Sequence, residues 1–282
     1  MPAFRATLLE QIIESQRRVE YVASIRGRPI SASRADPSSE LFDPLKAAIF
    51  HNREGNLDEA FWLVFNFVHF GKNRQTGWRL ARDIYGALGG RPWTWARISP
   101  DPEAFRSWLT SHQMTLGGRD GVERRFGNHR QYLSIDAAAP SGTGSAFVTY
   151  VQWVGTTRDH LTRINQALVE SGGDSRQAFD RLFHSMSAVK SFGRLAKFDY
   201  LTMLGKLGLA QIEPGSTYMV GATGPARGAR LLFGDTSNKL SKKELDRRSV
   251  QLGAALGVGM QVIEDALCNW QKSPGQFRAF RG

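Results

Sequence analysis

A turn rich in glycine lies near residue 220 and has the residue types that bind an anion. The chain reads YMVGATGPARGARLL from Tyr218 to Leu232. Gly221 and Gly224 carry no Cβ atom and can adopt positive φ, so a phosphate could approach the backbone amides closely. Pro225 suits the first position of a helix, whose free N–H groups and positive dipole end favour an anion. These residues predict an anion-binding turn followed by a helix.

Basic side chains follow this turn and support a phosphate backbone as the anion. Between Thr223 and Arg248 the chain has seven basic residues and three acidic ones. Such contacts give affinity for nucleic acid without selecting a sequence. The alternative is an ordinary Gly/Pro loop between two helices. The predicted nucleic-acid contacts are Gly221, Thr223, Gly224, Arg227, Arg230 and Arg247.

Two tryptophans flank a single residue in the stretch WTWAR, directly after the turn GGRP. Paired aromatic rings can stack an extruded base, so Trp93 and Trp95 are candidates for a base pocket. The alternative is that both rings pack in the core with their indole N–H groups satisfied.

A second polar cluster lies in FGNHRQY, where Asn128, His129 and Arg130 place amide, imidazole and guanidinium groups on one short segment. Recognition of a base edge needs such groups. A surface turn in which Asn128 caps a helix explains the same residues. His69 and His184 have apolar neighbours in sequence, and we expect each to be a core histidine with one hydrogen-bond partner.

A third cluster, EDALCNWQK, contains Asp265 and Asn269 one helical turn apart, and a fourth, FGRLAKFDY, contains Lys197 and Asp199. These carboxylate, amide and ammonium groups are further pocket candidates, since side chains four residues apart share one side of a helix. An i,i+4 network on a solvated helix, or a structural ion pair, is the alternative.

Composition limits the class of protein. The 282 residues are 41% hydrophobic, enough for a sizeable core, and the net charge of +11 favours a polyanionic partner. Cys268 is the only cysteine, which excludes an intramolecular disulfide, argues against a Cys-based zinc site and fits the reducing cytoplasm. No secretion signal or membrane span is visible. We expect no metal and no cofactor.

Helical periodicity dominates the chain, so we predict a mainly α fold. The expected helices include Thr76–Leu88, Pro102–Thr110, Phe147–Glu170, Ser175–Val189, Leu195–Leu207, Ala226–Phe233, Leu240–Leu256 and Met260–Gln271. The loop AAAPSGTGS predicts a possible division of one domain, 1–282, into lobes 1–140 and 146–282.

Four motifs extend this interpretation over most of the chain: FGNHR, KFDYLTMLGKLGL, GATGPARGARLLFG and EDALCNWQKSP. Together they resemble the family of alpha-glutamyl/putrescinyl thymine pyrophosphorylases, clade 3. The resemblance implies the bilobal helical fold of the helix-hairpin-helix DNA glycosylases. It also implies double-stranded DNA, in particular modified phage DNA, as the substrate.

The glycosylase pattern, carried over by this resemblance, implies that Asp246 is the catalytic aspartate. A carboxylate below the sugar would stabilise oxocarbenium charge and orient or deprotonate water. Asp235 is a rival that lies closer to the turn. The chain departs from the pattern because its turn is GATG and no lysine follows, with Ala226 and Arg227 at the candidate positions. Neither can form a Schiff base, so the expected enzyme is monofunctional.

The implied activity is excision of a bulky hypermodified pyrimidine, such as glucosylated hydroxymethylcytosine, from phage DNA in antiphage defence. The base would flip out of the duplex and leave an abasic site. One alternative is a transferase in which an amine displaces pyrophosphate from a modified thymine. Another is a non-catalytic DNA-binding protein.

Overall fold

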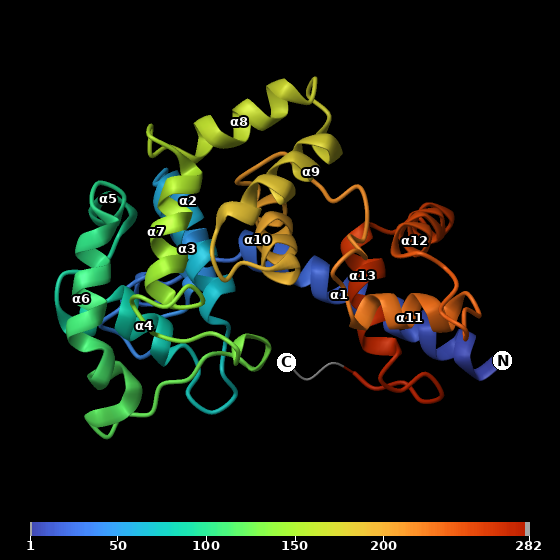
Figure 1. The fold of residues 1–282 in the computed structure, drawn as a ribbon, viewed down its shortest axis with the longest axis horizontal. Helices are drawn as coiled ribbons and strands as arrows, with labels where there is room; N and C mark the ends of the chain where they lie inside the picture. Colours follow the sequence, from blue (N-terminus) through green and yellow to red (C-terminus); the bar gives the residue numbers. More distant parts are fainter. Residues whose placement is uncertain (1, 280–282) are drawn as a thin grey trace. The chain divides into compact units, whose positions relative to one another are not determined.

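The computed structural model describes residues 2–279, and its regular elements there are helices, which confirms the mainly α prediction (Figure 1). Only two isolated bridges pair extended backbone in this part of the chain. None of the described helices is both long enough and apolar enough to span a bilayer. The α-helices are α1 (Pro2–Gly27), α2 (Pro44–Arg53), α3 (Leu57–Phe70), α4 (Arg79–Tyr85), α5 (Trp95–Ile98), α6 (Pro102–Met114), α7 (Thr143–Val154), α8 (His160–Glu170), α9 (Ser175–Ser185), α10 (Arg194–Leu207), α11 (Gly224–Leu232), α12 (Lys242–Leu256) and α13 (Met260–Trp270).

Local capping residues explain where many of these helices begin. A side-chain oxygen of the N-cap residue accepts a hydrogen bond from a first-turn amide in α2, α6, α8, α9 and α12. This contact satisfies an amide that has no intrahelical acceptor. The N-cap residues are Asp43, Asp101, Asp159, Asp174 and Ser241.

The predicted single helix 147–170 is wrong, because the chain forms two helices there. Gly155 ends α7 with φ of 107°, a conformation that a continuing helix excludes. Asp159 then caps α8 by accepting a hydrogen bond from Thr162 N at 2.8 Å. The apolar periodicity continues on both sides of this break, so the sequence pattern alone predicts one helix in place of α7 and α8.

The chain contacts divide into two compact units. The first unit combines residues 1–27 with residues from Glu213 onward, and the second comprises Arg28–Ile212. The loop 137–145, where the sequence suggested a division, lies inside the second unit.

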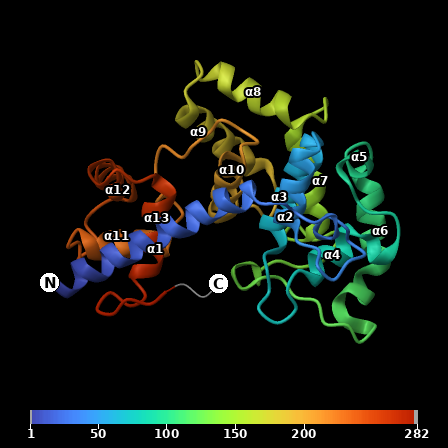
Figure 2. The same cartoon turned by 180° about the vertical axis from the view of Figure 1, so that it is seen from behind.

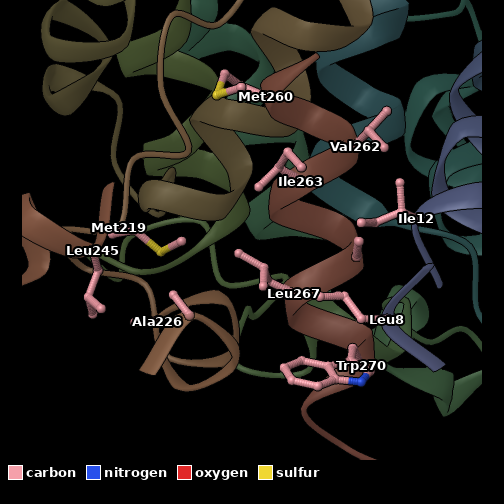
Figure 3. Packing of buried hydrophobic residues seen from close by; sticks show 12 residues of the cluster. Leu8, Ile12, Met219, Ala226, Leu245, Met260, Val262, Ile263, Leu267 and Trp270 are labelled. Carbon is pink, nitrogen blue, oxygen red and sulfur yellow. The ribbon is translucent and has the colours of Figure 1, made fainter. Parts of the chain in front are cut away.

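The first unit has a core drawn from α1, the turn before α11, and helices α11, α12 and α13 (Figure 3). Helices α1 and α13 lie side by side in both views (Figures 1 and 2). Leu8 of α1 and Leu267 of α13 meet in this core, and Met219 from the turn is fully buried with them. The turn is therefore anchored by one of its own side chains.

The second unit is built around α3, whose sequence LDEAFWLVFNFVHF is buried on most sides. A helix that is apolar all round must be covered by neighbours, and α2, α8 and α10 pack against it. Trp62, Phe65, Phe147 and Tyr150 form stacked and edge-to-face ring pairs at its centre. The result is an aromatic core separate from that of the first unit.

Candidate functional site

The glycine-rich turn of the first unit has left-handed backbone at two positions. Gly221 has φ of 83° and Tyr218 has φ of 51°. The amide of Ala222 donates to Met219 O at 2.9 Å and closes the turn. Val220 and Gly221 are exposed at its tip. The predicted conformational role of Gly221 is thus observed, and any larger residue there would be strained.

Gly224 serves a different purpose from the expected one. It is the first residue of α11, and its φ is not positive. A Cβ atom built on it would lie 2.8 Å from Sγ of Cys268. Gly228, one turn later, would bring a Cβ against the carbonyl oxygen of Leu267. The missing side chains therefore allow α11 to approach α13 closely.

The start of α11 retains amides that no side chain caps. Thr223 is the N-cap residue, is exposed and makes no side-chain capping hydrogen bond. The first-turn amides of a helix have no intrahelical acceptor and attract anions. Arg227 is exposed in this first turn, whereas the guanidinium of Arg230 forms an ion pair with Asp235.

Asp246 lies on the second turn of α12 and is half-buried. Its Oδ1 accepts hydrogen bonds from the amide of Thr217 at 3.0 Å and from the Thr217 hydroxyl. Within residues 2–279 its Oδ2 accepts none. The carboxylate is thus oriented through one oxygen while the other is available. Thr217 itself is fully buried, and the sequence carries no motif that would have singled it out.

The carboxylate of Asp235, the rival catalytic candidate, is occupied by structural hydrogen bonds. Its side chain is 3% exposed, and it accepts hydrogen bonds from the amides of Lys239 and Leu240 at 2.7 and 3.1 Å. Burial alone would raise the pKa of Asp235, but these amides and Arg230 outweigh burial and lower it. Both oxygens are used within the protein, which leaves Asp246 as the better catalytic candidate.

The basic residues of α12 are partly neutralised by their neighbour. Glu244 accepts hydrogen bonds from Arg247 and from Arg248, each at 2.7 Å. These bonds, that from Arg247 first, lower the pKa of Glu244 to about 2. Lys242 instead donates to the carbonyl oxygen of Ala222 at 3.0 Å and joins α12 to the turn. Arg247 remains 57% exposed, so a phosphate can compete with Glu244 for it.

Trp93 and Trp95 lie in the aromatic core of the second unit, 3% and 4% exposed. Trp95 donates its indole N–H to Arg158 O at 2.8 Å. Trp93 packs edge-to-face on Phe105. This burial favours the packing role that the sequence left open, because a ring without exposed surface cannot stack an incoming base. The expected hydrogen bond from the indole N–H is observed for Trp95 but not for Trp93, whose Nε1 has no partner among the described residues.

The FGNHR segment separates into exposed and buried residues. Asn128 and His129 are exposed on a 3₁₀ turn, whereas Arg130 is 4% exposed. Arg130 donates to Val68 O at 2.7 Å and to Asp199 Oδ2 at 2.9 Å. Two predicted pocket residues thus meet in a structural ion pair. A guanidinium used in this way holds the segment against α3 and α10.

The other predicted pocket residues have ordinary partners. Lys197 donates to Ser187 Oγ at 2.9 Å, and burial lowers its pKa. In the first unit, Asn269 donates to Asp265 Oδ1 at 3.0 Å, and Arg18 forms an ion pair with Asp265. The α13 cluster is therefore an i,i+4 pair that also holds α1.

A buried polar chain in the second unit had no signal in the sequence. Asp58 Oδ1 lies 2.6 Å from His160 Nδ1, and Tyr150 Oη lies 2.9 Å from His160 Nε2 and 2.7 Å from Tyr200 Oη. Its members come from α3, α7, α8 and α10. It ties these helices together through the core, and only Asp58, 41% exposed, reaches the surface.

The chain was compared with family models, curated proteins and solved structures. The family model for alpha-glutamyl/putrescinyl thymine pyrophosphorylase, clade 3, matches residues 3–282, which confirms the family predicted from the four motifs. No curated protein and no solved structure matches the chain significantly.

Proposed function

Since the chain belongs to the alpha-glutamyl/putrescinyl thymine pyrophosphorylase clade 3 family, we propose that it is a monofunctional N-glycosylase of modified DNA. The substrate would be a bulky hypermodified pyrimidine in double-stranded phage DNA, such as glucosylated hydroxymethylcytosine. The product would be an abasic site, and the cytoplasmic role would be antiphage defence.

The observation that carries this proposal is the geometry of Asp246. Thr217 fixes one carboxylate oxygen through its amide and its hydroxyl. The other oxygen can face a sugar or a water molecule. An oriented anion of this kind stabilises the oxocarbenium charge that develops as an N-glycosidic bond breaks, and it can accept a proton from the attacking water.

The turn and the first helical turn of α11 supply the grip on DNA in this proposal. Gly221 and Thr223 are exposed beside the uncapped amides of α11, and Arg227 is exposed on the same turn. Amides and guanidinium groups bind phosphate oxygens without reading bases. The phosphate would therefore hold the duplex while the modified base leaves the stack.

The residues after the turn support glycosidic cleavage without strand scission. Ala226 is buried and has no side-chain nitrogen, and Arg227 carries a guanidinium group in place of an amine. Neither supplies the neutral amine that a Schiff-base intermediate requires. We therefore expect abasic sites with intact phosphodiester bonds.

The family description favours a second candidate function, because it names a pyrophosphorylase of modified thymine. In that reaction an amine would attack the exocyclic carbon of a pyrophosphorylated hydroxymethyl-uracil. Pyrophosphate would leave with the bonding electrons, and Asp246 would accept the amine proton. The base would remain attached to the DNA, so product analysis separates the two reactions.

The test is to incubate the protein with unmodified, hydroxymethylated and glucosylated phage DNA, and to identify released bases by mass spectrometry. Asp246→Asn should lower the rate of base release at least about 100-fold, the scale of a lost acid–base group. DNA affinity should change little. Asp180→Asn, the same chemical change at an exposed position of α9, is the matched control.

Three outcomes distinguish the candidates. Abasic sites abolished by Asp246→Asn support the glycosylase. An aminated base retained in DNA, also lost in Asp246→Asn, assigns the transferase. Equal product formation by the two variants would remove Asp246 from catalysis. Binding of DNA without any product would leave a DNA-binding protein.

A further inference from the structure

The second unit contains a cavity of about 800 Å³ that no part of the proposed glycosylase chemistry uses. Four separate segments line it: the turn after α3, Leu80 of α4, the segment after α6, and residues 124–135. Cavities of this size accommodate metabolites as large as a nucleotide.

Close backbone contacts hold two of these walls together. The amide of Gly127 donates to Phe70 O at 2.8 Å, and a Cβ atom on Gly127 would lie 2.8 Å from the backbone of Gly71. The buried Asn73 side chain accepts hydrogen bonds from the amides of Gln75 and Thr76 and donates to Phe126 O at 2.9 Å. The walls are thus fixed by the protein before any ligand arrives.

The lining has an apolar floor and an amide-rich rim. Leu80, Leu116 and Leu133 are buried side chains of the floor, beside the half-buried ring of Phe126. Exposed amides line the same cavity at three positions, Gln75, Asn128 and Gln131. An apolar floor accepts the face of a planar base, and carboxamides can both donate to and accept from its edge.

The charge of the lining favours an anion. Arg74, Arg124 and Arg125 line this cavity, and none of its described lining residues is acidic. Asp83 and Asp120 neutralise Arg124. Arg125 is 57% exposed, and among residues 2–279 its one ion-pair partner is Glu123, which is itself 51% exposed. An exposed pair of this kind is weak, so a phosphate can replace the carboxylate.

A second cavity in this unit provides a contrast. It has a volume of about 380 Å³ and is lined by Arg163, Arg181 and Gln166, but also by Glu170 and Asp180. The carboxylates make that lining unsuitable for a phosphate. Both cavities have arginine and glutamine side chains in their linings. The larger cavity differs because its lining has no acidic residue among those described.

We propose that the larger cavity binds a nucleotide, with the base over the apolar floor and the phosphate at Arg125. Gln75, Asn128 and Gln131 would contact the base edge. The ligand can be a free nucleoside phosphate or a nucleotide within a single strand of DNA, since both present the same groups. Binding at this site does not require hydrolysis at Asp246.

Isothermal titration calorimetry at one fixed salt concentration tests the site with thymidine 5′-monophosphate, hexathymidylate and inorganic phosphate. The double variant Arg125→Ala/Gln131→Ala should weaken nucleotide binding at least about tenfold, because it removes one phosphate contact and one base-edge contact. Circular dichroism checks that this variant, altered only at exposed residues, remains folded.

The matched control is Arg181→Ala/Gln166→Ala, which removes an exposed arginine paired with a glutamate and an exposed glutamine from the smaller cavity. The nucleotide affinity of this control should stay within about twofold of that of the unaltered protein. A twofold change in affinity is smaller in free energy than the loss of one typical hydrogen bond.

Binding of the mononucleotide supports a free nucleotide as ligand if Arg125→Ala/Gln131→Ala weakens it and Arg181→Ala/Gln166→Ala does not. Binding of hexathymidylate alone, weakened in the same variant, supports a nucleotide within a strand. Equal affinities of the two double variants would overturn the proposal, as would an absence of saturable nucleotide binding or phosphate binding as tight as that of the mononucleotide. None of these results depends on base release by Asp246.

Discussion

His69 is a titratable residue that is 1% exposed in the core of the second unit. Its Nε2 lies 3.1 Å from Thr143 Oγ1, and among the described residues its Nδ1 has no partner. Burial, and then the nearby charge of Arg130, lower the pKa of His69 to about 3. The prediction of a core histidine with one partner is confirmed for His69. It is wrong for His184, which is 69% exposed on α9.

This lowered pKa makes His69 a source of acid sensitivity. Because the unfolded chain binds a proton on His69 with a pKa near 6.5, the stabilising contribution is present above pH 6.5 and is lost as pH falls towards 3. Between pH 7 and pH 5 the loss should be about 2 kcal/mol. When the pH is lowered from 7 to 5, urea unfolding should show a change in stability that is about 2 kcal/mol less favourable in the unaltered protein than in His69→Gln.

His184→Gln is the control for that experiment, because it removes an exposed histidine of the same unit. Glu59, whose pKa burial raises to about 7, acts in the opposite sense and loses its contribution as pH rises from 4.5. It is present in every variant, so it cancels in the comparison. An equal loss of stability in His69→Gln and the unaltered protein would contradict the assignment.

Side-chain roles were the part of the site that the sequence predicted least well. Residue type alone marks Arg130 as a recognition group, but its burial depends on Val68 and on Asp199, a residue 69 positions away. Thr217 was missed because a threonine that orients a carboxylate has no spacing signature. Asp246 was proposed as the catalytic residue only through a family pattern.

At the scale of elements, α11 and α13 pack so closely that the positions of Gly224 and Gly228 have no room for a side chain. Gly228 of α11 faces the carbonyl oxygen of Leu267. Gly228→Ala should therefore lower the free energy of unfolding of the first unit by about 1–3 kcal/mol, the usual cost of overpacking. In an open helical position the same change would stabilise by about 0.5–1 kcal/mol. Urea denaturation measures the difference.

Gly27→Ala at the end of α1 provides the comparison, since a Cβ atom there would meet no atom within 4 Å. It should leave the unfolding midpoint unchanged or raise it slightly. If Gly228→Ala behaves in the same way, the two helices have room for a methyl group and the packing argument fails.

Helices were predicted well where apolar spacing and end signals agree. The expected ranges 102–110, 175–189 and 260–271 correspond to α6, α9 and α13. The break between α7 and α8 was missed because the apolar pattern does not reveal that Gly155 adopts positive φ. Local propensity thus fixes the class of fold but not every interruption.

At the scale of the whole molecule, the first unit is discontinuous in sequence while the second is continuous. We expect a fragment of residues 28–212 to fold cooperatively, because its aromatic core lies within that range. Deletion of residues 1–27 should instead unfold α13, which would lose Leu8, Ile12 and the hydrogen bond from Trp270 to Thr7. Hydrogen exchange resolves both outcomes, and retained protection of α13 amides after the deletion would contradict this expectation.

Because the first unit is formed by two segments that are far apart in sequence, its parts are synthesised at different times. Helix α1 leaves the ribosome before the second unit is translated, whereas α13, the helix it packs against, is translated after that unit. Translation of the intervening residues 28–259 takes roughly 10–50 s at the usual rates. During that interval the apolar face of α1 around Leu8 and Ile12 lacks its cover. The first unit, which contains Asp246, is therefore complete only after α13 has been translated, and a nascent chain can carry a folded second unit before it has the activity proposed for the first.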